Sequence, residues 1–101
     1  MFVALWEFEV KPGCEERFEK GYGPEGEWAQ LFRHDPNYQG TRLLRDTVRN
    51  SVYLTLDFWK SRNAYERFMQ SHRSEYKRLD AVGEELTLRE RKIGWFEEAA
   101  K

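Results

Sequence analysis

His72 is the first candidate for chemistry in this sequence, because it lies within an apolar stripe of a predicted helix. An imidazole in such a place can act as a general base or as an axial ligand. It can equally be a core histidine that is hydrogen-bonded to a neighbour, and no partner residue in the sequence decides between the two. His34 closes a shorter predicted helix and is interpreted as a C-terminal residue favoured by the helix dipole.

A second set of candidates is aromatic. Aromatic residues make up 16% of the chain, which is a large bulk for one small core. Rings on the first predicted strand and on the predicted helices can line a cavity for a flat aromatic ligand by stacking. The alternative for the same rings is ordinary filling of the core. The five candidates for such a cavity are Trp6, Trp28, Tyr65, Phe68 and Tyr76.

Asp57 lies inside an otherwise apolar strand, where an unpaired carboxylate is costly to bury. One interpretation is a general base, and the other is an ion pair with Arg42 or Arg45 on the neighbouring strand. The more apolar side chains of its own strand are expected to face the helices. Asp57 alternates with them, so it is expected on the opposite, dimer-facing side in a structural role. Those apolar side chains are Leu54, Leu56 and Phe58.

The elements that must position these residues follow from the hydropathy pattern. Period-two alternation predicts strands, and stripes recurring every three or four residues predict helices. The last helix is expected to begin after Ser61 as N-cap and to run without interruption to about Gly83. The predicted strands are 2–10, 38–46, 52–59 and 86–96, the predicted helical pieces are 15–22, 27–34 and 61–83, and residues 97–101 are expected to form a flexible tail.

This order is βαββαβ, which predicts one α+β domain of the ferredoxin-like kind over residues 1–101. Two helices are expected to cover one face of a four-stranded antiparallel sheet. The other face carries Val3 and Leu5 from the first strand, and leaving such an apolar area in water is unfavourable. A two-fold homodimer with the sheets face to face is therefore expected.

The overall composition excludes several classes of protein. The formal net charge is −1, so nucleic-acid binding has no electrostatic basis. The single cysteine, Cys14, excludes a disulfide within the chain, and no His or carboxylate pair has a recognised metal spacing. No apolar run approaches the ~20 residues needed to span a bilayer, and the N-terminus lacks the features of a signal peptide. We expect a soluble, cytoplasmic protein without a metal.

Three segments carry a resemblance to a known family. They are Trp6-Glu7-Phe8-Glu9-Val10-Lys11-Pro12-Gly13, then Gly40-Thr41, and then Leu54-Thr55-Leu56-Asp57-Phe58-Trp59-Lys60-Ser61 leading to Ala64-Tyr65 and Phe68. With them the chain resembles the antibiotic biosynthesis monooxygenase domain family over nearly its whole length. The resemblance implies a homodimeric α/β barrel with a pocket between helices and sheet in each subunit.

Members of that family include cofactor-free oxygenases of aromatic polyketides and haem-degrading enzymes. The haem-degrading branch uses an Asn on the first strand with a Trp and a His on the long helix. The matching positions here hold Trp6, Phe68 and Arg78, so haem degradation is not expected.

The resemblance favours a cofactor-independent monooxygenase-like protein that acts on a small aromatic or polycyclic compound in that pocket, with no cofactor and with His72 as the base. Whether the protein turns a substrate over stays open. The alternatives are a non-catalytic dimeric protein that binds a flat hydrophobic ligand such as haem, and a scaffold that only dimerises.

Overall fold

Four strands form one antiparallel sheet in the computed structural model, which describes residues 1–100. The order across the sheet is β2-β3-β1-β4, so the first and third strands are central and the other two are edges. This is the predicted ferredoxin-like arrangement. The strands are β1 (Phe2–Val10), β2 (Tyr38–Arg45), β3 (Val52–Trp59) and β4 (Thr87–Glu97).

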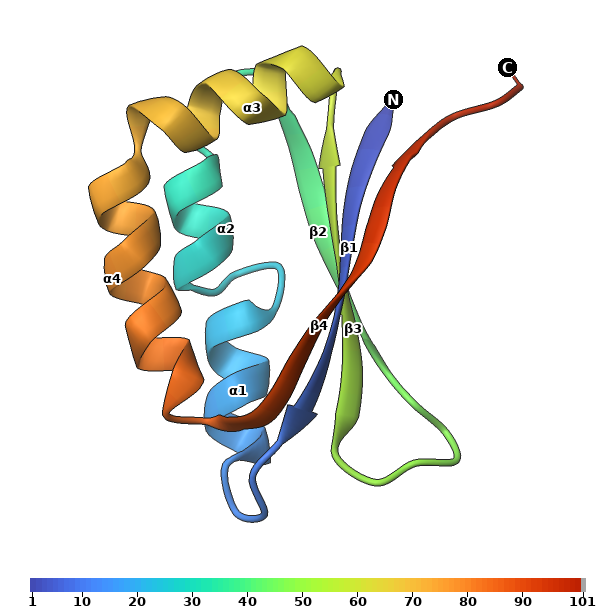
Figure 1. Cartoon of the computed structure of the whole chain (residues 1–101), viewed down its shortest axis with the longest axis vertical. Helices are drawn as coiled ribbons and strands as arrows, with labels where there is room; N and C mark the ends of the chain where they lie inside the picture. The colour runs from blue at the N-terminus through green and yellow to red at the C-terminus, as the bar shows by residue number, and fades with distance from the viewer. Residues whose placement is uncertain (101) are drawn as a thin grey trace.

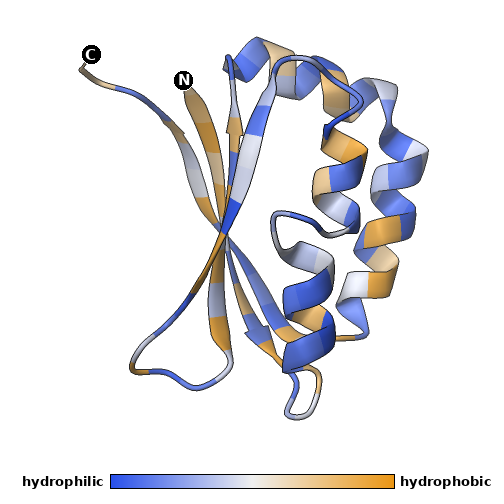
Figure 2. Cartoon of the chain, turned by 180° about the vertical axis from the view of Figure 1, so that it is seen from behind, coloured by the Kyte–Doolittle hydropathy of each residue, from blue (hydrophilic) through white to orange (hydrophobic). Residues whose placement is uncertain are grey.

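Helices cover one face of the sheet and leave the other face without a covering layer (Figure 1). They carry hydrophobic and hydrophilic segments side by side, as expected for elements with one buried side (Figure 2). Their bounds are α1 (Glu15–Tyr22), α2 (Glu27–Phe32), α3 (Arg62–Ser71) and α4 (Arg73–Glu84). Among residues 1–100, no helix has the length and apolar character needed to cross a membrane.

The prediction of one continuous helix over 61–83 was wrong, because the chain leaves helical geometry at His72 (φ −119°, ψ 33°). Its start was predicted correctly: the Ser61 hydroxyl accepts a hydrogen bond from the Ala64 N–H at 3.1 Å. At the break, the His72 N–H still donates to the Phe68 carbonyl at 3.0 Å. The break lets α3 cross one end of the sheet while α4 runs along its length (Figure 1).

The helix-facing side of the sheet forms the core. On β1 the predicted alternation is confirmed, since Phe2, Ala4, Phe8 and Val10 are all buried. On β3 the predicted orientation was wrong: the set that includes Trp59, which is fully buried, faces the helices. Its large aromatic rings fill the core better than the aliphatic set would. That inward set is Tyr53, Thr55, Asp57 and Trp59.

The uncovered face of the sheet is apolar at one end of the strands and charged toward the other. Strand register places Val3 beside Phe58 and Phe96, and Leu5 beside Leu56. Phe96 keeps 48% of its surface exposed. Toward the other end of the strands this face carries charged residues instead, and Glu7 forms ion pairs there with Arg49 at 2.8 Å and Arg91 at 3.2 Å.

Candidate functional site

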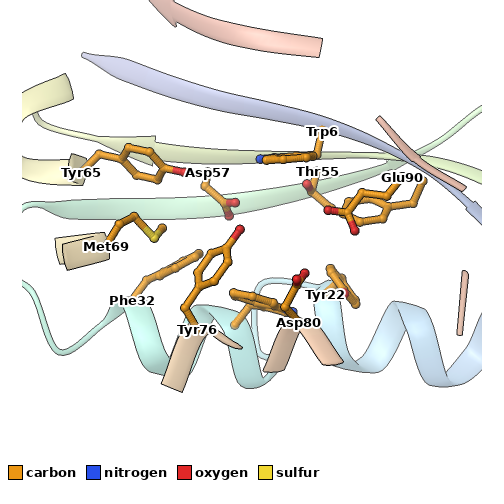
Figure 3. Close-up of a pocket in the computed structure, with 12 residues that line it drawn as sticks. Trp6, Tyr22, Phe32, Thr55, Asp57, Tyr65, Met69, Tyr76, Asp80 and Glu90 are labelled. Atoms are coloured by element: carbon orange, nitrogen blue, oxygen red, sulfur yellow. The ribbon is translucent and has the colours of Figure 1, made fainter. Parts of the chain in front are cut away.

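A cavity lies between the helices and the sheet, and side chains from both layers line it (Figure 3). Its volume, taken as the space open to the centres of water-sized molecules, is about 40 Å³, which is room for a few waters. It adjoins a wider groove of about 410 Å³ that reaches Trp95 on β4. Trp6, Tyr65, Met69 and Tyr76 line both spaces, so a ligand larger than the cavity can extend into the groove.

The twelve lining residues are mainly aromatic and acidic. Among residues 1–100, those that line the cavity include no lysine, arginine or histidine. The walls therefore suit an aromatic ring, and the polar groups are hydroxyls and carboxyls. The lining residues are Trp6, Phe8, Tyr22, Trp28, Phe32, Thr55, Asp57, Tyr65, Met69, Tyr76, Asp80 and Glu90.

Asp57 is the polar group at the centre of the sheet wall. It lies on β3 directly opposite Thr41 of β2, whose hydroxyl donates a hydrogen bond to Asp57 Oδ1 at 2.6 Å. Asp57 is half-buried, and the desolvation of its carboxyl group raises its pKa to about 6, although the Thr41 hydrogen bond opposes the shift. Asp57 can therefore hold or release a proton close to neutral pH.

The expected ion pair between Asp57 and a strand arginine was wrong. Arg45 instead lies 3.7 Å from Glu19 of α1. Arg42 pairs in register with Leu56 and so lies on the uncovered face of the sheet, away from Asp57. The carboxyl group faces the cavity with a hydroxyl partner and without a cation.

Two tyrosine hydroxyls from the helical layer face Asp57 across the cavity. Figure 3 shows the hydroxyls of Tyr65 on α3 and Tyr76 on α4 directed toward its carboxyl group. Burial raises the pKa of Tyr76 to about 12 and raises the pKa of Tyr65 as well, and the nearby carboxylate adds to both shifts. Both phenols stay protonated at neutral pH and can donate hydrogen bonds to an anion in the cavity.

The other end of the cavity is acidic. Asp80 on α4 and Glu90 on β4 lie there beside Tyr22 (Figure 3). Burial raises the pKa of both carboxyl groups. The charge of Asp80 raises the pKa of Glu90 further, and the charge of Glu84 raises the pKa of Asp80 further. Burial also raises the pKa of Tyr22. This end favours neutral or cationic groups over anionic ones.

Four of the five aromatic residues singled out in the sequence line the cavity: Trp6, Trp28, Tyr65 and Tyr76. Phe68 does not, because it is 2% exposed inside the core, where its ring packs against Phe32 and Trp59.

His72 also lies outside the cavity lining. It sits at the break between α3 and α4, and its ring stacks on that of Phe68 with the centroids 4.1 Å apart. His34 lies beyond it, with its ring centroid 6.4 Å away. A continuous helix would place His72 on the apolar stripe, whereas the break places it in the link between the two helices. Its assignment as the base in the pocket therefore has no support from its position.

Sequence reasoning missed the orientation of Asp57 and the contributions of Tyr22, Asp80 and Glu90. For Asp57 a signal was present, since it alternates with Tyr53 and Trp59, whose bulk belongs in a core. For the other three we see no comparable signal. No group of three or more metal-ligating side chains comes together within residues 1–100.

Comparisons with known proteins identify the family and the fold. A family model described as antibiotic biosynthesis monooxygenase matches residues 1–79. No curated protein matches the chain.

Solved structures show the same fold at low sequence identity. The structure of SnoaB, a cofactor-independent oxygenase from Streptomyces nogalater, is 18% identical with a TM-score of 0.76, over 99% of this chain and 94% of that one. A putative antibiotic biosynthesis monooxygenase from Bordetella bronchiseptica is 18% identical with a TM-score of 0.74, over 98% and 97%. One from Nitrosomonas europaea is 12% identical with a TM-score of 0.71, over 99% and 100%.

Proposed function

The chain belongs to the antibiotic biosynthesis monooxygenase family, and from this premise we propose that it is a cofactor-independent monooxygenase that oxidises a small aromatic compound in the cavity around Asp57. The observation that carries the proposal is the Asp57 carboxyl group, with a pKa of about 6, facing an aromatic cavity without a cation. A base with a pKa near the working pH is efficient in proton transfer. Asp57 takes the role that the sequence suggested for His72, because it lines the cavity and His72 does not.

The chemistry needs a substrate with an acidic C–H bond next to its ring. Asp57 accepts that proton, and the resulting carbanion is rich enough in electrons to reduce O₂ directly. A CH₂ group then becomes a carbonyl, with one oxygen atom in the product and the other in water. The four electrons that O₂ accepts all come from the substrate, so the equation balances without a redox cofactor.

The remaining lining residues support this reaction in two ways. Trp6 and Trp28 offer flat apolar surfaces on which an aromatic ring can stack. The hydroxyls of Tyr65 and Tyr76 can donate hydrogen bonds to the charge that develops on the substrate. The cavity of about 40 Å³ has room for only a few waters, so even a small aromatic compound would extend into the neighbouring groove of about 410 Å³.

The proposal is tested by O₂ uptake with aromatic compounds that carry an acidic CH₂ group, from the smaller 2-coumaranone to the tricyclic anthrone. With ¹⁸O₂ the product should contain one labelled oxygen atom. Asp57→Asn should lower turnover at pH 7.5 by about 10²-fold or more, the usual effect of losing a positioned base. The matched control is Asp46→Asn, an acidic residue in the β2–β3 loop away from the cavity, which should keep full turnover. Equal rates in the Asp57 variant and the wild-type chain would contradict the assignment.

We also propose that two copies pair through the uncovered sheet face. Val3, Leu5, Leu56, Phe58 and Phe96 form its apolar part, and contiguous apolar surface of this kind is typical of interfaces. Light scattering should give the mass of two chains, and Leu56→Glu should give that of one chain because it would bury an unpaired charge. A wild-type chain that stays single at 100 µM would contradict the pairing.

The alternative role as a haem-binding protein has no support in the cavity. His72, the candidate axial ligand, lies outside its lining, with its ring stacked on Phe68. Titration with haemin should produce no saturable change in the Soret band. A one-to-one complex would restore this alternative.

A further inference from the structure

A chain of hydroxyl groups leads away from Asp57 through two residues that do not line the cavity, Thr41 and Tyr38. The Tyr38 hydroxyl lies 2.5 Å from Thr41 Oγ1, which in turn lies 2.6 Å from Asp57 Oδ1. Thr41 has one hydroxyl proton and donates it to the carboxylate. The Tyr38 hydroxyl must therefore donate to Thr41, so both protons point toward Asp57.

An irregularity in β2 is what brings the two hydroxyls together. In a regular strand, residues 38 and 41 would point to opposite faces of the sheet, because alternate side chains do. The register with β3 shifts between Tyr38 and Gly40, and Gly40 has φ +127°, a value that side-chain-bearing residues rarely adopt. Tyr38 pairs with Trp59 and Thr41 with Asp57, so both point to the helix-facing side.

The outer end of the hydroxyl chain lies near the surface, at the edge of the sheet. Thr41 is 9% exposed, whereas Tyr38 is half-buried and lies on β2, an edge strand of the sheet. Near its outer end the charges of Arg33 and Glu25 act on the Tyr38 hydroxyl. The path thus joins the cavity-facing carboxyl group, through a buried hydroxyl, to a half-buried side chain on an edge strand.

No other charged or titratable group near Asp57 replaces Thr41 as its hydrogen-bond partner among the described residues. Tyr65 and Tyr76 face it from the helices, and Asp80 and Glu90 lie at the far end of the cavity. None of these groups is a cation, so none forms an ion pair with the carboxylate that would prevent its protonation. Thr41 is the hydrogen-bond donor that Asp57 has among the described residues.

We propose that Thr41 and Tyr38 form a proton relay that carries to solvent the proton that Asp57 takes from the substrate. This rests on the proposed function. While a substrate fills the cavity, water cannot collect the proton there, so the proton has to leave through groups outside the cavity lining.

The relay step conserves protons and breaks no carbon bond. After Asp57 is protonated, its carboxyl group turns so that the protonated oxygen faces Thr41, and the two hydroxyls turn outward. The Asp57 proton then passes to Thr41 Oγ1, the Thr41 proton passes to the Tyr38 oxygen, and the Tyr38 proton passes to water. Each hydroxyl ends with one proton, and the three groups return to their first orientation when the next cycle starts.

The experiment that tests the relay does not depend on turnover. In equal parts H₂O and D₂O, the ¹³Cβ signal of Thr41 splits into two lines if its hydroxyl proton exchanges slowly with solvent and merges into one if exchange is fast. We expect one line in the wild-type chain and two lines in Tyr38→Phe, which keeps the ring against Phe32 and Trp59 but removes the hydroxyl. A loosened structure would speed the exchange, so slowing identifies the relay. One line in both proteins, two lines in both, or the reverse order would overturn it.

A second measurement uses any substrate that shows O₂ uptake. Tyr38→Phe should lower kcat at least tenfold with KM unchanged, and Thr41→Ser, which keeps a hydroxyl, should retain most of the wild-type kcat. An unchanged kcat in Tyr38→Phe would also overturn the relay. If no substrate is consumed while the exchange result holds, the proposed function fails and the hydroxyl path stands as a proton connection to Asp57.

Discussion

Replacing Asp57 with asparagine should stabilise the protein at neutral pH and leave its stability nearly unchanged at pH 4. The carboxyl group has a pKa of 3.8 in the unfolded chain and about 6 in the folded one. Because the folded value is the higher one, the protonated form favours folding below pH 3.8, and this contribution is lost as the pH rises through 6. At 1.36 kcal/mol per pKa unit, the ionised group costs about 3 kcal/mol at pH 7.5.

Asparagine has the same shape, can accept the Thr41 hydrogen bond and carries no charge, so it removes most of this cost. For a chain of 101 residues, about 3 kcal/mol corresponds to a rise in Tm of about 14 °C as an upper figure. The assay is urea unfolding at a fixed protein concentration, at pH 4 and at pH 7.5. At pH 4 the gain should be well under 1 kcal/mol.

The control is Asp46→Asn, for which the sign is reversed. Hydrogen bonds from the backbone N–H groups of Arg49 and Val48, with the Arg49 side chain, lower the pKa of Asp46 to about 2. Its charge therefore stabilises the folded state above pH 4, and the variant should be less stable at pH 7.5. If Asp57→Asn raises the free energy of unfolding no more at pH 7.5 than at pH 4, Asp57 is not desolvated, and its selection as a base loses its physical basis.

Three further substitutions test parts of the structure around the site. Ser61→Ala should lower the free energy of urea unfolding by about 1 kcal/mol because it removes the cap of α3, and Ser61→Asp should not. Glu90→Gln should raise the thermal midpoint at pH 8 but not at pH 4, because burial and the charge of Asp80 raise the pKa of Glu90; an equal rise at both pH values would contradict this. Gly83→Ala should lower the midpoint because its Cβ would overlap the Tyr22 hydroxyl, whereas in an open helix the same change stabilises by about 1 kcal/mol.

Much of the fold could be predicted from the sequence because local patterns determine it. β1 and β3 begin and end at the predicted residues, and Pro12-Gly13 gives a clear end to the first strand. The break at His72 could not be predicted, since no glycine or proline marks it and the apolar stripe continues through it. Only the packing of two helices against different parts of the sheet requires it.

The site was harder to predict because alternation separates the two faces of a strand without saying which one is buried. Leu54 and Leu56 are more hydrophobic than Thr55 and Asp57, so hydropathy favoured the wrong face of β3. The volume of Trp59 at the end of the same strand decides the orientation in the folded protein. Residue volume, and not only hydropathy, thus sets which face of this strand meets the helices.

Two acidic residues in the central strands show why Asp57 stands out. Glu7 on β1 has two arginine partners, Arg49 and Arg91, and hydrogen bonds from them lower its pKa, which is how a carboxylate in a sheet usually contributes to structure. Asp57 on β3 faces the cavity with one hydroxyl partner. Its ionisation removes a sizeable part of the free energy of unfolding, which is about 5–15 kcal/mol for domains of this kind. A leucine or an asparagine would fill the same place at lower cost. A charge kept at a destabilising position, beside an aromatic cavity and at the end of a hydroxyl chain to the surface, is better explained by proton transfer than by folding.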